Sequence, residues 1–420
     1  MEYTIQIHGI KSEKNFLRCF LLSSNLLLSF ILLASSMVFS TASYGDNDTL
    51  KGGTADYTHY PQGGGMRVTA TFGPDERLWR IVPEKKFIYV DYSIDLGKTF
   101  SAPVRINRQP QRIKVSRQNR PDIVIDHSGR IFVIYTAVIA HTTSQLLSIS
   151  NDSGRSFSIP ILLSKKAPEA ISYLGRLALS PSGQVYVFWL DDRDRTDWRK
   201  PGFSVYSTMI GSESSSNLVN QRVAKNTLCE CCRIAVAFDN DDQPILFTRF
   251  IYQDNIRDHG LLQMRPKGEE SLPWRVTFDK WKIRGCPEQG PAISISDNKR
   301  FHIAWFTQGS IRQGLFYAYS SNQGRHFSNP LSFGTPGNMP GHSDIMADGK
   351  HVFLTWTEFD GTKMQLLVMK SIDMGQSWLP AKPIAESTVS SDIPFLLRSA
   401  KGVFVSWNSK NEGYRLIPLE

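Results

Sequence analysis

Cysteines are concentrated in one short segment of the chain, LCECCRIAV, which contains Cys229, Cys231 and Cys232. Another cysteine, Cys286, follows in the segment GCPEQGPAI. Thiolates with a nearby imidazole suit a soft ion such as Cu(I), or Zn(II). We therefore predict a Cu or Zn site at these four cysteines, with His342 of the segment PGHSDIM as its nitrogen ligand.

The same cysteines could form disulfides instead. A bridge from Cys286 to one member of the cluster is the simplest arrangement. A bridge within the cluster, between vicinal cysteines or across one residue, would be strained. The disulfide alternative therefore predicts two thiols that are left free or paired under strain.

Three arginines each begin an apolar segment of similar pattern: Arg120 in NRPDI, Arg176 in GRLAL and Arg233 in CRIAV. Fixed guanidinium groups bind a carboxylate through two parallel hydrogen bonds, so this set predicts a binding site for an anionic ligand. The alternative is that the arginines pair with acidic residues on neighbouring loops. Those acidic residues are Asp191, Asp192, Asp194, Asp254 and Asp258.

A few carboxylates are weak candidates for catalysis. Asp191 and Asp192 stand in the segment WLDDRDR, and Glu288 follows Cys286. Hydrolysis of a glycosidic bond needs positioned carboxyl groups or an equivalent nucleophile, which is why these residues are considered. A cluster of Asp and Arg on a loop is also typical of salt bridges, so the catalytic residues are not identified by this pattern.

Repeated turns indicate how these residues are positioned. Four octets share the form Ser-x-Asp/Asn-x-Gly-x-x-Phe/Trp, a tight turn in which the Asp or Asn accepts backbone N–H groups and Gly supplies positive φ. The octets are SIDLGKTF at Ser93, SNDSGRSF at Ser150, SSNQGRHF at Ser320 and SIDMGQSW at Ser371.

Each octet follows a segment that reads as a short strand, a polar turn and a second strand rich in Val, Ile, Phe and Trp. Four antiparallel strands per unit of 50 to 57 residues predict an all-β fold, a single β-propeller with four-stranded blades. We favour seven blades, with six as the alternative. The last unit lacks its outer strand, so N- and C-terminal segments should pair to close the ring. Recurring second-strand tryptophans should lie in the core between blades: Trp189, Trp305, Trp356 and Trp407.

The octets resemble the Asp boxes, or BNR repeats, of the sialidase-like propeller superfamily. The resemblance covers roughly residues 66–420. It implies that octets lie at the outer rim of one face and that ligands bind at the mouth of the central channel on the other face. Family sialidases hold the substrate carboxylate with three arginines, but the superfamily also contains binding proteins, so its fold does not fix its activity.

The first residues predict export. Three basic residues precede an apolar run at 20–39, and small residues follow it, as in a signal peptide. We assign 1–42 to this peptide, with an uncleaved anchor as the alternative, 43–65 to a possible closing strand, and 66–420 to the propeller. Cys19 lies in this leader. Export leads to the periplasm or the exterior, where disulfides persist.

The net charge of +9 is mild for 420 residues and does not indicate nucleic acid. The sequence therefore predicts an exported, sialidase-like propeller that binds a ligand or a soft metal ion at the channel mouth and is not a glycosidase. The expected partners are an anionic small molecule, a glycan or a protein, and the chain should be a monomer without a transmembrane domain beyond the leader. An exo-glycosidase acting on acidic sugars and a protein-interaction scaffold are the alternatives.

Overall fold

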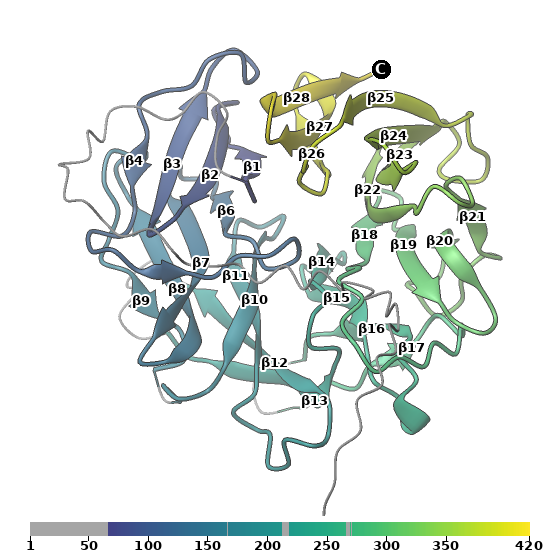
Figure 1. Cartoon of the computed structure of the whole chain (residues 1–420), viewed down its shortest axis with the longest axis horizontal. Coiled ribbons are helices and arrows are strands. Elements are labelled where there is room, and N and C mark those ends of the chain that lie inside the picture. The colour runs from purple at the N-terminus through teal and green to yellow at the C-terminus, as the bar shows by residue number, and fades with distance from the viewer. Residues whose placement is uncertain (1–65, 166, 212–217, 266–268, 270) are drawn as a thin grey trace, which may run out of the picture. The chain divides into compact units, whose positions relative to one another are not determined.

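A computed structural model describes residues 66–420, except 166, 212–217, 266–268 and 270. These residues form seven antiparallel sheets arranged in a ring, which is a seven-bladed β-propeller (Figure 1). The first strand of each sheet is the innermost, and later strands step outward. The predicted fold is confirmed. The predicted signal peptide and closing strand lie outside the described residues.

The strands of the first three blades have the following bounds. Blade one has β1 (Thr69–Phe72), β2 (Leu78–Glu84), β3 (Phe87–Ser93) and β4 (Val104–Arg105). Blade two has β5 (Arg112–Ile113), β6 (Asp122–Ile125), β7 (Ile131–Ile139), β8 (Thr142–Ser150) and β9 (Ile161–Leu162). Blade three has β10 (Ser172–Leu179), β11 (Val185–Asp191), β12 (Phe203–Ile210) and β13 (Gln221–Leu228).

The remaining blades continue around the ring. Blade four has β14 (Ala235–Phe238), β15 (Pro244–Arg249), β16 (His259–Gln263) and β17 (Trp274–Arg275). Blade five has β18 (Ala292–Ile295), β19 (Phe301–Gln308), β20 (Gln313–Ser320) and β21 (Leu331–Phe333). Blade six has β22 (Gly341–Asp348), β23 (His351–Phe359), β24 (Met364–Ser371) and β25 (Lys382–Ser387). Blade seven has β26 (Phe395–Ser399), β27 (Gly402–Ser409) and β28 (Gly413–Leu419).

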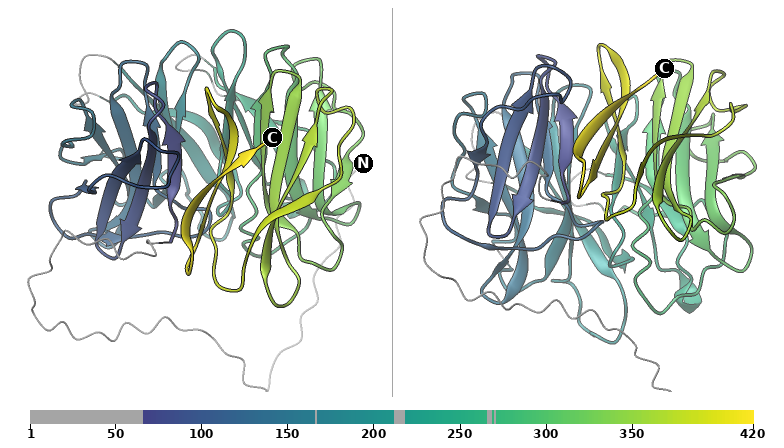
Figure 2. Two further views of the ribbon diagram at one scale, coloured as in Figure 1. Left: turned by 90° about the horizontal axis from the view of Figure 1, so that it is seen from above. Right: turned by 45° about the horizontal axis from the view of Figure 1, so that its top comes forward.

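Blade seven has three strands in the described part of the chain, as the sequence predicts. It lies beside blade one, so the C-terminal strands meet the N-terminal ones (Figure 2). The backbone N–H groups of Arg67 and Val68 donate to the carboxylate of Asp392. Side-chain hydrogen bonds therefore join the two ends of the ring in addition to the packing of β1 against β26.

The four octets adopt the same turn, which connects the third strand of a blade to the fourth. In the second octet, Ser150 Oγ donates to Asp152 Oδ1 at 2.8 Å and accepts from Gly154 N at 2.9 Å. Asp152 also accepts from the backbone N–H of Ser156 at 2.9 Å. Gly154 has φ +80, and a Cβ there would lie 2.7 Å from the Trp79 ring. Glycine is therefore required by both the backbone conformation and the packing.

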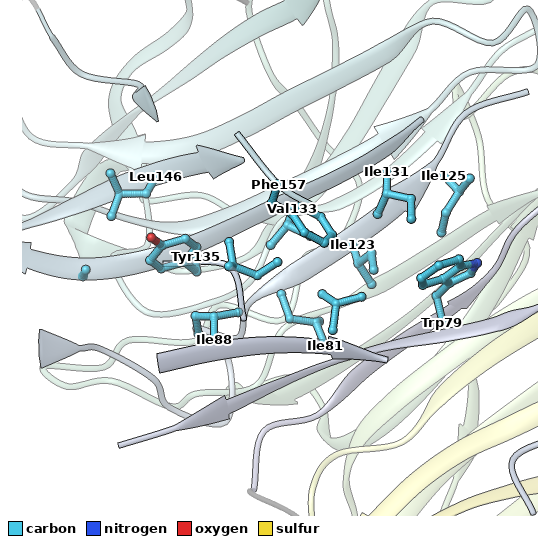
Figure 3. Close-up of a cluster of buried hydrophobic side chains, with 13 residues drawn as sticks. Trp79, Ile81, Ile88, Ile123, Ile125, Ile131, Val133, Tyr135, Leu146 and Phe157 are labelled. Carbon is cyan, nitrogen blue, oxygen red and sulfur yellow. The ribbon is translucent and has the colours of Figure 1, made fainter. Parts of the chain in front are cut away.

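The hydrophobic core lies between facing blades. In Figure 3, Trp79, Ile81 and Ile88 of blade one pack against the buried residues of β6 and β7 in blade two. The four recurring tryptophans are at most 2% exposed, and each indole N–H donates to an oxygen. The acceptors belong to Asp191, Asp279, Glu358 and the backbone carbonyl of Asp392. These tryptophans are core residues, as predicted.

Strand direction assigns the connections to two faces. The octets share one face with the turns between first and second strands, because neighbouring strands are antiparallel. The opposite face, here called the mouth face, carries the links between second and third strands and the links between blades. It includes segments 114–121, 229–234 and 283–291. No helix in the described ranges is long and apolar enough to cross a bilayer.

Candidate functional site

The cysteines meet on the mouth face. Cys231, before β14, forms a disulfide with Cys286, before β18, and their Cα atoms are 5.7 Å apart. Cys229 and Cys232 are free thiols, and both are fully buried. The structure thus contains the bridge that the disulfide alternative predicted, with two thiols left over.

The two free thiols interact with each other and with positive charge. The Sγ atoms of Cys229, Cys231 and Cys232 lie within 4.8 Å of one another. A hydrogen bond from Cys232 lowers the pKa of Cys229 to about 6, and Arg249 and Arg257 act in the same direction against the effect of burial. The pKa of Cys232 is raised well above its usual value by the same hydrogen bond and by burial. Cys229 is therefore the more acidic member of the pair.

Two buried arginines flank these thiols. Arg257 Nη1 donates to Cys229 Sγ at 3.3 Å. Arg249 is fully buried, with its guanidinium over the Trp281 ring at 4.4 Å and its Nη2 donating to the carbonyl of Phe306. Neither arginine has a carboxylate partner among the residues that the structure describes. The two arginines therefore create a cationic environment that favours a thiolate at Cys229.

His342, the predicted nitrogen ligand, is in β22 and does not belong to the three-sulfur group. Its φ is +57, within an irregularity of the β22–β23 pairing, and its backbone N–H donates to Gln289 Oε1. Burial lowers the pKa of His342 to about 3, and nearby arginines, Arg117 first, add to this effect. The imidazole is neutral, and its Nδ1 has no partner in the described structure.

Two of the three predicted anion-binding arginines converge on one aromatic ring. The guanidinium groups of Arg120 and Arg233 lie 4.8 and 5.0 Å from the centre of the Phe395 ring. Arg120 Nη1 donates to the carbonyl of Ile393, and Arg233 Nη2 donates to that of Ser343. Both side chains are largely buried, and burial lowers the pKa of Arg120 to about 10, which leaves it cationic at neutral pH.

Each predicted arginine has a carboxylate within ion-pair distance. Arg120 lies 3.8 Å from Asp392, Arg233 lies 3.9 Å from Asp344, and Arg176 lies 3.2 Å from Asp122. These acids differ from the loop acids that the sequence analysis named as alternative partners.

Arg176 differs from the other two arginines in its exposure. Its side chain is 38% exposed, and with Asp122 and Asp344 it lines a central cavity of about 330 Å³. The other walls of this cavity come from the innermost strands of blades one, two, three, four, six and seven. Arg176 is therefore the one member of the predicted set whose charge faces open space.

The candidate catalytic carboxylates have separate positions. Asp191 is fully buried, pairs with Arg193 at 2.6 Å and accepts from Trp189, so it supports the core. Asp192 accepts from the backbone N–H of Ile171, and burial raises its pKa. Glu288 is half-buried on the segment after the disulfide.

A tyrosine and a glutamate do meet on the mouth face. The Tyr173 hydroxyl donates to the backbone carbonyl of Glu230, whose carboxylate accepts from Gly202 instead. Burial, and then the charge of Glu230, raise the pKa of Tyr173. This tyrosine is consequently less ready to ionise than a free one, which is the opposite of an activated nucleophile.

A pocket on the mouth face lies at blades six and seven. Its volume is about 770 Å³. Its cationic lining residues are Arg117 and Lys410, and the neutral His342 of β22 also lines it. Aspartate and glutamate are absent from the described residues that line it, whereas Ser, Thr, Asn and Gln side chains are present. This lining suits a polar, negatively charged ligand.

The basic segment from Arg105 to Arg120 reaches across the mouth face. Residues 112–113 form β5 on the edge of β7. The segment then extends toward blades four and five, which Gln118 contacts. Gln118 Oε1 accepts from the backbone N–H groups of Arg233 and Gly290, at 3.3 and 3.0 Å. Gln118 thus fixes the segment that presents Arg117 to the pocket.

Several of these residues were not identified from the sequence. The cations beside the thiols, Arg249 and Arg257, are in β15 and after the 3₁₀ turn Gln253–Asn255, and no motif marks them. Lys410 stands in an ordinary turn between β27 and β28. The available signal for Arg117 was the composition of segment 105–120, which contains six basic residues and no acidic one.

No family model and no curated protein sequence matches this chain. Solved structures do match it. The BP39L lectin from Burkholderia pseudomallei is 12% identical, with 85% of this chain and 100% of the lectin covered and a TM-score of 0.56. A polysaccharide lyase of family PL25, an ulvan lyase, is 11% identical, with 84% and 92% covered and a TM-score of 0.54.

The Hadza microbial sialidase Hz136 is also similar, at 13% identity. The match covers 82% of this chain and 75% of the sialidase, with a TM-score of 0.48. At such low identities the lectin and the lyase support the propeller fold alone.

Proposed function

We propose that this protein is an exported, sugar-related propeller that binds an acidic carbohydrate in the pocket at blades six and seven. The observation that carries this proposal is the lining of the pocket, which presents Arg117 and Lys410 without a carboxylate from the described residues. Such a lining favours a ligand with a negative charge and hydroxyl groups. In this proposal the protein is a monomer and binds its ligand outside the cytoplasm.

The geometry of the pocket supports recognition of a sugar acid. Arginine can hold a carboxylate through two parallel hydrogen bonds, and lysine adds a point charge. Ser390, Thr388 and Asn411 offer polar groups for ring hydroxyls, and Phe359 offers an apolar surface. A volume of about 770 Å³ is within the range of small-molecule sites.

Binding is a better proposal than hydrolysis. Most glycosidases need two carboxyl groups on either side of the bond that is cleaved. The described lining of this pocket contains none, and Tyr173, beside Glu230, has a raised pKa. The resemblance of the octets to Asp boxes supports a sialidase-like fold, which is used by binding proteins as well as enzymes.

Export is supported by the disulfide. Cys231 and Cys286 form a bridge between blades four and five, and such bridges persist in oxidising compartments. The predicted leader at 1–42 supports the same conclusion. The periplasm and the exterior remain equal alternatives within the proposal.

Binding of tetragalacturonate and of its fully methyl-esterified form, measured by calorimetry, tests the proposal. We expect the acid to bind and the ester to bind at least about tenfold more weakly, because a charged hydrogen bond contributes roughly 1.5–3 kcal/mol. Arg117→Ala and Lys410→Ala should each weaken binding of the acid. Arg155→Ala, an exposed arginine in an octet on the opposite face, is the matched control.

Equal binding of acid and ester would refute charge recognition in the pocket. Failure of both, together with failure of 3′-sialyllactose, would refute carbohydrate binding and favour the protein scaffold. Release of a new reducing end from tetragalacturonate or from 3′-sialyllactose would favour the glycosidase alternative.

A further inference from the structure

We propose that Cys229 and Cys232 bind one Cu(I) ion through their two sulfurs while the Cys231–Cys286 disulfide stays intact. The three-sulfur group and its arginines do not line the pocket described above. The inference therefore goes beyond the proposed carbohydrate binding and does not depend on it.

The disulfide determines how many ligands are available. Cys231 is bonded to Cys286, so two of the three clustered sulfurs remain as thiols. Cys229 Sγ and Cys232 Sγ are at most 4.8 Å apart. Two collinear metal–sulfur bonds of about 2.3 Å, the length found for zinc, would span about 4.6 Å. The two sulfurs are therefore close enough to bind one metal ion together.

The backbone holds the two ligands in place. The N–H of Cys229 donates to the carbonyl of Arg249 at 2.9 Å, continuing the pairing of Leu228 with Phe250. Cys229 and Cys232 are both fully buried. A buried pair of soft sulfur ligands is suited to Cu(I), which prefers thiolates.

The surrounding charges favour a monovalent ion. Arg249 and Arg257 are at most 5% exposed and have no carboxylate partner in the described part of the chain. Two thiolates with Cu(I) carry one net negative charge, which compensates one of these two cations. Two thiolates with Zn(II) are neutral and compensate neither buried cation, which is less favourable.

Ligand number also separates the two metals. Structural zinc sites are almost always four-coordinate. In the described residues, the metal-binding group contains cysteines alone, so neither an imidazole nor a carboxylate completes a zinc site there. Cu(I) needs only the two thiolates, and binding releases the thiol protons to solvent with no change in oxidation state.

The experiment uses the whole protein without reduction, under anaerobic conditions, with Cu(I) supplied as its bicinchoninate complex. Thiol counting first establishes that two of the four cysteines after Cys19 are free. We expect the protein to remove one Cu(I) per chain from the chelator. Substitution of a residue that contacts a metal ligand without binding the metal costs roughly 10–100-fold in metal affinity. Loss of a ligand itself, in Cys229→Ser or Cys232→Ser, should therefore lower the Cu(I) affinity at least about 100-fold.

Two controls separate the pair from the rest of the cluster. The double variant Cys231→Ser/Cys286→Ser lacks the disulfide and should still bind one Cu(I). Arg257→Met keeps most of the side-chain volume and should weaken Cu(I) by about 10–100-fold. X-ray absorption on the unaltered protein should show two sulfurs around copper, which tests the site even if a serine variant does not fold.

The opposite results would overturn the inference. The first is that protein with two free thiols takes up no Cu(I), or does so only after the disulfide is reduced. The second is that Cys229→Ser has the same Cu(I) affinity as the unaltered protein, or that Zn(II) binds more tightly than Cu(I). The third is that X-ray absorption shows three or more sulfurs around copper. None of these results depends on whether a carbohydrate binds.

Discussion

Arg67 donates its backbone N–H to both carboxylate oxygens of Asp392, at 2.9 and 2.7 Å, and its Nη1 to Oδ1 at 2.8 Å. The same carboxylate accepts from the backbone N–H of Val68 and from Asn408 Nδ2. The Asp392 side chain is fully buried. One acidic residue of the last blade thus binds the beginning of the described chain.

Asp392→Ala should destabilise the protein by about 3–5 kcal/mol, because removing one partner of a buried ion pair leaves the others without compensation. Chemical denaturation measures this difference in the free energy of unfolding. Asp75→Ala removes an exposed carboxylate that pairs with Arg77 and is the control, with an expected change of at most about 1 kcal/mol. Equal effects of the two substitutions would show that Asp392 does not close the ring.

The octets should make stability depend on pH in the acid range. Hydrogen bonds from Ser156 and Ser377 lower the pKa of Asp152 and of Asp373 to about 2, below the unfolded value of about 4. A lowered folded pKa contributes stability that is present above the unfolded pKa and is lost as pH falls through the folded pKa. The free energy of unfolding should therefore decrease from about pH 4 to pH 2.

Asn in place of these aspartates provides the matched test. The third octet already has Asn322, whose Oδ1 accepts from Ser320 Oγ and from the His326 N–H, at 2.8 and 2.9 Å. Asp152→Asn and Asp373→Asn should keep the turn and reduce the acid dependence. An unchanged pH profile in the double variant would exclude these carboxylates as its origin.

The disulfide should stabilise the protein by restricting the unfolded chain. Cys231 and Cys286 are separated by 55 residues, for which chain entropy gives about 4 kcal/mol. Cys231→Ser/Cys286→Ser should lower the free energy of unfolding by an amount of this order. In denaturant, the four cysteines after Cys19 should give two reactive thiols before reduction and four after it. Four before reduction would exclude the bridge.

The three predicted arginines should separate into two classes. Arg120 is largely buried and contacts Asp392 and the ring of Phe395, whereas the Arg176 side chain is 38% exposed in the central cavity. Arg120→Ala should therefore cost several kcal/mol of stability, and Arg176→Ala about 1 kcal/mol or less. Thermal unfolding measures both.

Binding of citrate to the same two arginine variants tests the predicted anion site. If that site exists at the central cavity, Arg176→Ala should weaken citrate binding with little change in the melting temperature. A large loss of stability with unchanged citrate binding would show that Arg176 is only an ion-pair residue.

The sequence predicted the fold well because its signals are local and repeated. Each octet contains its own hydrogen-bond partners, so its turn can be inferred without knowing the rest of the chain, and the spacing of the octets gives the blade length. The position of Cys286 near the cluster followed in the same way, from strands that begin on one face. The pairing of Cys231 rather than Cys229 or Cys232 did not follow, because spacing leaves all three open.

The candidate site was less predictable because its contacts join distant segments. Asp392 with Arg120 and Asp344 with Arg233 join different blades. Arg257 lies 28 residues from Cys229 along the chain, and a single sequence does not show that these two segments are in contact. His342 was expected beside the sulfurs from its position at the start of β22. An irregular pairing and a positive φ distinguish that position from a regular strand start.

The hydrogen bonds between Arg67 and Asp392 span 325 residues. Contacts of such long range slow folding, because the entropy of closing a large loop is lost before the contact contributes stability. During synthesis the first blade leaves the ribosome well before Asp392 does. The beginning of the chain therefore has no partner in blade seven until the five blades between them have been made. The hydrogen bonds that join blade one to blade seven therefore cannot form before residue 392 has been made.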